Sequence, residues 1–331
     1  MKQFLKKIFP KTILNKRTAF IKNRRMKKLL KQDHDRFLKY SFGKDKLNFS
    51  QIEARLTKEY HSLEKGLSYQ ELRLGFGKQV LQNVIDLMIE YRRQGFPLNE
   101  HVYQTALSNL HSYITVHDQN NFDVNDLKEV FESLSKGTSY GETGGVHYKT
   151  KDEMIEKSKE DFKSFSISRH SVRDYTSEPV SYEVIEKAFK LASHTPSACN
   201  RQSWKLRVVE TPKLKKIIQA NQNGNRGFGD YIDKFIIITG DVQYYDRLRE
   251  RNQANIDGGM YAMNLLYALH YYQIAAVPLS ASLNLKQEEN LRKTFNISDA
   301  ENFIMFIGIG NYTDEFKIPK SDRRPVQYNK F

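Results

Sequence analysis

The stretch Arg169-His170-Ser171-Val172-Arg173 places two cations and a hydroxyl on alternate residues. Alternate residues of an extended chain face the same way, so Arg169, Ser171 and Arg173 can converge on one ligand. Arginine offers a planar fork of donors that suits phosphate oxygens, and a hydroxyl adds a further donor. The stretch is therefore a candidate anion clamp, although a solvated basic turn explains so short a motif at least as well.

A second segment follows one helix later. Ser181 is a candidate N-cap, and the apolar spacing over residues 182–193 predicts an amphipathic helix that delivers the chain to a turn. The turn reads Pro196-Ser197-Ala198-Cys199-Asn200-Arg201-Gln202-Ser203-Trp204. Within it, Asn200 and Gln202 offer amide groups that can donate and accept along the edge of a heteroaromatic ring. The two segments together suit a phosphorylated, planar, hydrogen-bonding ligand.

These two segments resemble the flavin-binding fingerprint of the nitroreductase family of FMN-dependent oxidoreductases. The resemblance implies that Arg169 and Ser171 hold the FMN phosphate and ribityl chain, and that Arg173 lies near the pyrimidine edge of the flavin. The residues that it places against the ring and the ribityl chain are Pro196, Ser197, Asn200 and Gln202. One departure is visible, because the family usually has proline where Ser203 stands.

Two apolar segments extend the match. Residues 234–240 are a short apolar run bounded by turn residues, which predicts a buried strand. Residues 257–270 are apolar on nearly every face, so we expect a helix that is buried all round. The resemblance makes this the central helix of the fold, packed against a second subunit in a homodimer, whereas a core helix of a monomer fits the sequence equally well.

After that helix, residues 274–281 read as a strand that runs into a turn. The resemblance places Leu279 and Ser280 beside the flavin, where a backbone N–H from this position donates to the flavin N5. Such a donor is set by the shape of the main chain, so the residue type at this position need not be diagnostic.

The chain closes with one more strand and a basic turn. Residues 303–310 are apolar and predict a buried strand, and residues 320–325 follow it with three cations. The resemblance carries Arg323 or Arg324 to the FMN phosphate without choosing between them. A solvated basic tail explains each of the two arginines equally well.

The resemblance covers about residues 165–331 and implies an α+β fold. We expect a mostly antiparallel sheet of four or five strands flanked by helices, with strands near 204–209, 234–240, 274–283 and 302–309, plus an all-α N-terminal extension. The implied activity is FMN-dependent transfer of hydride from NAD(P)H through flavin N5 to an unidentified small-molecule acceptor. Because that chemistry belongs to the flavin, no catalytic side chain is expected; Arg173 would act electrostatically and Ser280 through its backbone.

Several other site classes find no support. The nine histidines show no metal-ligand spacing, so we expect no metal site. No Gly-x-Gly-x-x-Gly follows a strand, which disfavours a dinucleotide-binding Rossmann unit. Cys199 is the only cysteine; we expect a small buried residue and a reducing cytoplasm. The acceptor pocket is expected to draw on residues 244–256.

Residues 33–150 are predicted to form a separate helical region. Helical periodicity marks the four segments 51–67, 77–94, 100–117 and 123–135, and the glycine-rich run 137–148 reads as a linker or loop. The stretch His61-Ser62-Leu63-Glu64-Lys65-Gly66-Leu67 resembles an N-terminal extension of some nitroreductase-like proteins, including ones associated with bacterial surface polysaccharide genes. A lid over the flavin, a dimer brace and a docking platform all fit its periodicity.

The net charge of +14 is concentrated at the N-terminus, where residues 1–32 carry twelve Lys or Arg and no acidic residue. Apolar residues interleave with these cations. Such a basic amphipathic arm can lie on an anionic membrane surface, remain a solvated tail, or contact a phosphate-rich polymer, nucleic acid included. We do not expect nucleic acid to be a partner of the protein. An alternative function follows: a flavin-binding or degenerate accessory protein at the inner membrane face, possibly in surface polysaccharide biosynthesis. The predicted division is an arm (1–32), an extension (33–150) and an FMN-binding domain (151–331).

Overall fold

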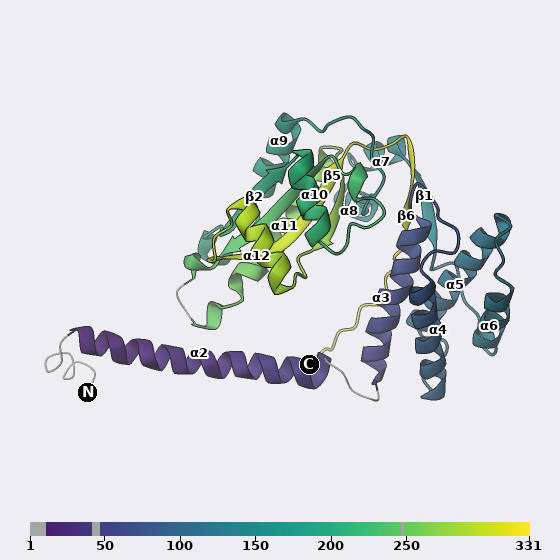
Figure 1. Ribbon diagram of the computed structural model, residues 1–331, viewed down its shortest axis with the longest axis horizontal. Coiled ribbons are helices and arrows are strands. Elements are labelled where there is room, and N and C mark those ends of the chain that lie inside the picture. Colours follow the sequence, from purple (N-terminus) through teal and green to yellow (C-terminus); the bar gives the residue numbers. More distant parts are fainter. Residues whose placement is uncertain (1–10, 42–46, 246–247) are drawn as a thin grey trace.

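A computed structural model describes residues 11–41, 47–245 and 248–331. Figure 1 shows a sheet domain, a group of helices beside it and one long helix that runs away from that group and along one side of the sheet domain. The first ten residues of the predicted arm lie outside the described residues.

A four-stranded antiparallel sheet in the order β2-β3-β5-β4 forms the centre of the sheet domain. Its strands are β2 (Trp204–Val209), β3 (Lys234–Asp241), β4 (Ala275–Ser280) and β5 (Glu301–Gly310). All eight residues of β3 are buried, and alternate residues of this strand enter two different cores. The sheet is therefore covered on both faces, which explains why its central strands read as continuous apolar runs.

Helices cover each face of this sheet. On one face, α9 (Tyr182–Ala192) and α11 (Gln253–Tyr271) share a core with alternate residues of β3. On the other, α10 (Pro212–Asn221) and α12 (Leu285–Phe295) contribute to a second core. The predicted N-cap of α9 is confirmed, because the Ser181 hydroxyl accepts a hydrogen bond from the Val184 N–H at 3.3 Å. The predicted α+β fold with an antiparallel sheet is confirmed.

The N-terminal helices have a core of their own. They are α3 (Phe49–Leu67), α4 (Lys78–Arg93), α5 (His101–Gln119) and α6 (Asn125–Ser135). A capping box begins α3: the Asn48 side chain accepts from the Gln51 N–H, and the Gln51 side chain accepts from the Asn48 N–H, each at 3.0 Å. The four predicted helices of this region are confirmed to within about two residues at their ends.

A short antiparallel ribbon connects the helical region to the end of the chain. Residues 146–150 form β1 (Val146–Thr150), which pairs with β6 (Glu315–Pro319). The prediction of a loop over 137–148 is therefore wrong at its end. The β1 side of the ribbon is largely exposed and only five residues long, and it follows directly on a glycine-rich run, so its short alternation was not recognised as a strand. Two short helices, α7 (Lys151–Lys157) and α8 (Phe162–Ser168), then lead into the sheet domain.

The basic arm is a long helix, α2 (Lys11–Ser41), which continues beyond the predicted boundary at residue 32. Its described side chains are exposed except for the half-buried Met26. Large apolar side chains are among the exposed ones, with exposed fractions of 69 % for Phe20 and 55 % for Leu30. Among the described residues, no helix combines the length and apolarity that crossing a membrane requires.

Candidate functional site

The predicted anion clamp runs as extended chain beside β4. It follows α8, whose N-cap Asp161 accepts hydrogen bonds from two backbone N–H groups. The Val172 N–H donates to the Ala276 carbonyl at 3.1 Å, and the Val172 side chain is fully buried in the core. Because side chains alternate along extended chain, Ser171 and Arg173 face the opposite way from Val172.

Arg173 is a buried guanidinium with few partners. Only 9 % of the residue is exposed, and Nη1 donates to the Ser171 carbonyl at 3.2 Å. Its Nε is buried with no hydrogen-bond partner among the described residues. The guanidinium lies 5.8 Å from the ring centre of Phe228, and burial lowers its pKa. A buried donor without an acceptor is costly, so this group fits a ligand that brings acceptor oxygens or nitrogens.

Arg169 lies close to the C-terminal basic turn. Within the described chain it makes no hydrogen bond and has no carboxylate partner. Burial lowers the pKa of Arg169, and the positive charge of Arg323 lowers it further. Arg323 itself donates only to the Ser321 carbonyl, at 3.1 Å. Arg324, in contrast, forms an ion pair with Glu53 of α3 at 2.6 Å. Arg323 therefore lies near the clamp, whereas Arg324 is paired with the helical extension.

Two histidines near Arg169 have lowered pKa values, in part because of the positive charge of Arg169. Burial, with Arg169 as the next cause, lowers the pKa of His170 to about 4 and that of His270 to about 4. His270 Nε2 lies 2.8 Å from the Ser168 hydroxyl, directly before the clamp. Both histidines are therefore neutral near pH 7, and the arginines carry the positive charge here.

Leu279 and Ser280 lie at the far end of β4. They follow Ala276, the clamp's backbone partner, by three and four residues, so Ser280 lies about 13 Å along the strand from that contact. Leu279 is buried and Ser280 is exposed, and the Ser280 carbonyl accepts from Gln222 Nε2 at 3.0 Å. This end of β4 is on the same strand as the clamp contact, at a spacing comparable to the length of a flavin mononucleotide.

The predicted turn has an unusual backbone. Cys199, Asn200 and Gln202 have φ values of 53°, 55° and 46°, in the left-handed region that non-glycine residues rarely adopt. The Gln202 N–H donates to the Ser197 hydroxyl at 3.0 Å, and Gln202 Nε2 donates to the Asn200 side chain at 3.1 Å. The exposed Pro196 begins the turn.

The expectation of a buried Cys199 is wrong, because the structure exposes it. Its left-handed φ turns the side chain away from the body of the domain, a feature that residue type alone does not reveal. Where the family usually has proline, the buried Ser203 places its hydroxyl 2.8 Å from the Tyr245 hydroxyl. The turn is thereby tied to the segment that follows β3.

The turn and the clamp lie at opposite ends of α11. The Ala198 N–H donates to the Asp257 carboxylate at 3.1 Å near the start of this helix, whereas Ser168 contacts His270 at its end. Thirteen residues of helix separate these two anchors, which is about 20 Å. Within one chain, the structure therefore brings together Arg169, Ser171, Arg173 and Arg323, and it leaves the turn apart from them.

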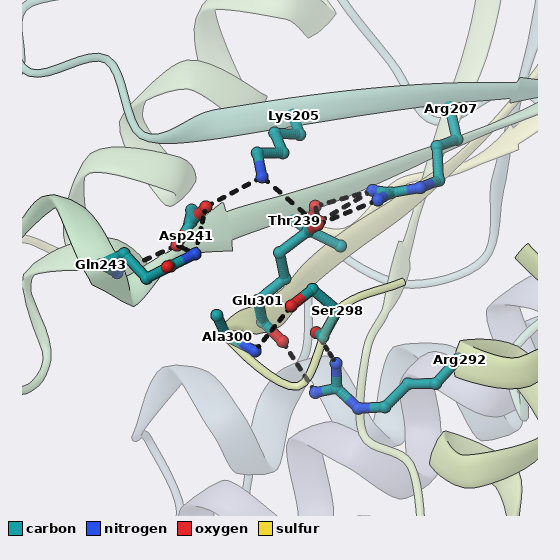
Figure 2. A network of polar contacts seen from close by, with 9 residues as sticks. All are labelled: Lys205, Arg207, Thr239, Asp241, Gln243, Arg292, Ser298, Ala300 and Glu301. Atoms are coloured by element: carbon teal, nitrogen blue, oxygen red, sulfur yellow. Dashed lines mark hydrogen bonds and ion pairs between the residues drawn. The ribbon is translucent and has the colours of Figure 1, made fainter. Parts of the chain in front are cut away.

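A second cluster of buried charges lies on the sheet, and the sequence analysis missed it (Figure 2). Glu301 of β5 is 2 % exposed and accepts from Arg207 Nη1 at 2.9 Å and Nη2 at 3.0 Å. Lys205 lies 3.4 Å from Glu301 and 2.8 Å from Asp241, and the Thr239 hydroxyl also donates to Glu301. Burial by itself would raise the pKa of Glu301, but these hydrogen bonds hold it below its usual value.

This Glu301 cluster is closed. Arg292 of α12 donates to the Glu301 carbonyl at 2.7 Å, so the cluster joins that helix to β2, β3 and β5 (Figure 2). Each buried charge meets an opposite charge, which indicates a structural role. Alternate cations on β2 facing acids on neighbouring strands were the available signal in the sequence. Among the described residues, no group of three or more His, Cys, Asp or Glu side chains is placed to hold a metal ion.

The helical extension also reaches the clamp, a contact that its periodicity alone did not distinguish from a dimer brace or a docking platform. The Ser321 hydroxyl lies 3.2 Å from His61 Nδ1 and 3.4 Å from the Glu64 carboxylate on α3. The Tyr69 hydroxyl donates to the Arg226 carbonyl at 2.9 Å. The segment that directly precedes Arg323 is thus fastened to α3.

Comparisons with known proteins agree with this geometry. Residues 167–311 match the model of the nitroreductase family. An iodotyrosine deiodinase of Nematostella vectensis is 26 % identical over 210 residues, which are 54 % of this chain and 76 % of that protein. A CLA biosynthesis enone reductase of Lactiplantibacillus plantarum is 35 % identical over 85 residues, which are 25 % of this chain and 39 % of the relative.

Two solved structures are similar to part of this chain. A nitroreductase of Desulfovibrio desulfuricans in complex with FMN has a TM-score of 0.43 and 20 % identity, covering 52 % of this chain and 99 % of that one. An FMN-dependent nitroreductase of Clostridium difficile has a TM-score of 0.39 and 20 % identity, covering 50 % and 90 %. Residues 167–311, somewhat less than half of this chain, form a domain that matches the nitroreductase family.

Proposed function

We propose that this protein is an FMN-dependent oxidoreductase that takes hydride from NAD(P)H and passes it to a small-molecule acceptor. The observation that carries the proposal is the set of guanidinium groups at the clamp, Arg169, Arg173 and Arg323, which have no carboxylate partner in the described chain. Bound FMN supplies the hydride chemistry at its N5.

In this proposal, each residue of the clamp has a separate task. Arg169, Ser171 and Arg323 bind the phosphate and the ribityl chain through charge-assisted hydrogen bonds. Arg173 donates toward the pyrimidine edge, where its buried positive charge favours the electron-rich reduced ring. The backbone at Leu279 and Ser280 presents an N–H toward N5. The free donor on Arg173 Nε supports this fit, since a flavin offers the acceptors that the protein does not.

We propose that the site is completed by a second copy of the chain. The expectation of an all-round buried central helix is wrong for a single subunit, because α11 exposes an apolar stripe with Ile256 53 %, Met260 40 % and Met263 39 % exposed. A Cβ on Gly259 would meet nothing within 4 Å, which leaves room for close approach. This chain's own turn lies too far from the clamp to contact a flavin bound there. The turn over residues 196–202 of a second copy would contact that flavin instead.

The acceptor class follows from the names of the relatives only as a proposal. Reduction of an enone and reductive deiodination of an iodotyrosine each consume two electrons, the equivalent of one hydride, and the deiodination also releases iodide. In this chain, Arg201 ties the turn to the predicted acceptor segment over residues 244–256, through 2.9 Å to the Tyr244 carbonyl and 2.7 Å to the Glu250 carboxylate. We propose that this segment selects the acceptor.

Purified full-length protein tests the function directly. It is expected to emerge yellow, and NADH or NADPH is expected to bleach its absorbance near 450 nm within a turnover. Addition of an enone or a halogenated phenol should restore the colour. A colourless protein that takes up no added FMN would overturn the proposal.

A second candidate role is favoured by α2. Its exposed Phe20, Ile21 and Leu30 lie among cations on an unshielded helix, which suits the surface of an anionic membrane. A flavin-binding or degenerate accessory protein at the inner membrane face would use this helix as its anchor. Sedimentation with anionic liposomes, compared between the full chain and a chain lacking residues 1–32, tests it; equal binding by the two would reject the membrane role.

A further inference from the structure

The C-terminal half of α3 lies against the clamp. Glu64 is fully buried, and its carboxylate accepts from Asn109 Nδ2 at 3.1 Å and lies 3.1 Å from His61 Nδ1. Ser321 of the C-terminal tail contacts the same two α3 side chains, at 3.2 Å from His61 and 3.4 Å from Glu64. These contacts fix the rotation of α3 relative to the tail that carries Arg323.

Tyr69, two residues after the end of α3, contacts the residues around Arg173. The Tyr69 ring centre lies 6.1 Å from that of Phe228, and the Arg173 guanidinium lies 5.8 Å from the same Phe228 ring. Gly66 lets α3 pack closely on Phe76 within the extension, because a Cβ at this position would lie 2.0 Å from a ring carbon of Phe76. Lys65 is in the last turn of α3, four residues before Tyr69, and so lies on the same side of the helix as the Tyr69 contact with Phe228.

Lys65 is a half-buried ammonium with no hydrogen bond and no ion pair in the part of the chain that the structure describes. Burial lowers its pKa, and the charge of Arg173 lowers it further. Arg173 is only 9 % exposed, and its Nε has no hydrogen-bond partner among the described residues. Two positive charges that are both partly removed from water, here those of Lys65 and Arg173, are unfavourable unless an anion lies between them. Glu64 is the nearby acid, but Asn109 and His61 already engage it.

We propose that Lys65, on the helical extension, binds an anionic group of the bound flavin together with Arg173, so that α3 forms part of the cofactor site. This inference rests on the proposed flavin function. It gives the extension a task within the site itself. The buried Leu56 and Leu63 anchor α3 in the helical core, and Lys65 on the same helix is near enough to Arg173 for their charges to interact. The anionic group is either the phosphate or the negative charge of the reduced ring.

The test compares three full-length variants. Lys65→Met removes the charge at similar length, Lys65→Arg keeps it, and Arg55→Met removes one charge from the exposed side of the same helix. We expect Lys65→Met to weaken FMN binding to the apoprotein about 10- to 100-fold, the range of a charge-assisted hydrogen bond. Lys65→Arg should recover most of the affinity, and Arg55→Met should not change it. Equal FMN affinity in Lys65→Met and Arg55→Met would overturn the inference.

Riboflavin, which lacks the phosphate, identifies the anionic group. If Lys65 binds the phosphate, Lys65→Met should weaken FMN binding and leave riboflavin binding unchanged. If it faces the ring, binding of both should weaken and the flavin reduction potential should fall. Either pattern supports a role in the site.

The stability of the apoprotein provides a readout of opposite sign. Removal of an unpaired like charge beside Arg173 should raise the unfolding temperature of the apoprotein by a few degrees, whereas a merely structural lysine would lower it. Inorganic pyrophosphate distinguishes failure of the anion site at Lys65 from failure of the proposed flavin function. If wild type binds no flavin, the proposed function fails, and stabilisation of wild type but not Lys65→Met by pyrophosphate would still support the anion site. Equal stabilisation of both would overturn it.

Discussion

The clamp and the Glu301 cluster both bury charged side chains on the sheet domain, yet they differ in one respect. In the Glu301 cluster every cation meets a carboxylate, with Arg207 bidentate to Glu301 and Lys205 on Asp241. In the clamp, Arg169 and Arg173 have no carboxylate partner within the described residues. A buried charge by itself therefore does not indicate a binding site. A buried charge that has no oppositely charged partner in the protein does.

The largest expected effect belongs to the closed cluster. Arg207→Met leaves the Glu301 carboxylate buried without its bidentate partner, so we expect a loss of about 3 kcal/mol in the free energy of unfolding. Urea unfolding of the apoprotein measures it, with Arg55→Met as the control for net charge. FMN affinity should stay at the wild-type value. An Arg207→Met protein of unchanged stability with weakened FMN binding would show that the Glu301 cluster binds the cofactor and is not structural.

The open clamp should respond the other way. Arg169→Met removes a cation whose partner is the ligand, so we expect FMN affinity to fall about 100-fold while the unfolding midpoint of the apoprotein does not decrease. Equilibrium titration of flavin fluorescence gives the affinity, and urea unfolding gives the midpoint. A destabilised apoprotein with unchanged FMN affinity would show that Arg169 is structural.

The exposed stripe on α11 tests whether the clamp needs a second copy. Met260→Glu places a carboxylate on that stripe, so we expect monomers in sedimentation and about 10-fold weaker FMN binding, because the partner's turn is lost. The control is Leu285→Glu on α12, an 88 % exposed position outside the stripe. Monomeric wild type with tight FMN binding would refute the two-copy site.

A smaller effect is expected in the pH dependence of stability. Burial, with Arg169 beside it, lowers the pKa of His270 to about 4 in the folded apoprotein, whereas the unfolded chain titrates near 6.5. The unfolded state thus binds more protons between these values. The stability due to neutral His270 is present above about pH 6.5 and is lost as the pH falls toward 4. His270→Gln should flatten this part of the stability profile. An unaltered slope would contradict the assignment.

The smallest effect is predicted for the residue next to the clamp. Arg324 is paired with Glu53, so Arg324→Met should change FMN affinity by less than about two-fold, whereas Arg323→Met should weaken it about 10-fold. The two variants remove the same charge from adjacent positions and differ only in partner. Equal losses in FMN affinity would show that general positive potential, not placement, binds the ligand.

The sequence predicted the central sheet closely, because β2 to β5 are apolar runs bounded by turn residues and need no partner to be recognised. It missed the β1–β6 ribbon, whose two short strands are far apart in the chain and are recognised only once they pair. The exposed stripe of α11 could not be predicted from the sequence for a related reason. A helix that is apolar on all faces does not reveal which face the rest of its own chain leaves uncovered.

The candidate site was predictable only in part. The motif around Arg169 identified the clamp, but the choice between Arg323 and Arg324 depended on which of them meets Glu53 in three dimensions. Likewise, nothing in the sequence singled out Lys65, because Arg173, whose charge it meets in the folded protein, is distant in sequence. Proximity of like charges is a property of the tertiary structure, and no local pattern encodes it.

The most direct test of the account is the affinity of the full-length apoprotein for FMN relative to riboflavin, measured by titration in wild type and in Arg169→Met. If unpaired guanidinium groups bind the phosphate, wild type should prefer FMN by about 100-fold, and Arg169→Met should lose most of that preference. Equal affinities of wild type for the two flavins would contradict the central claim.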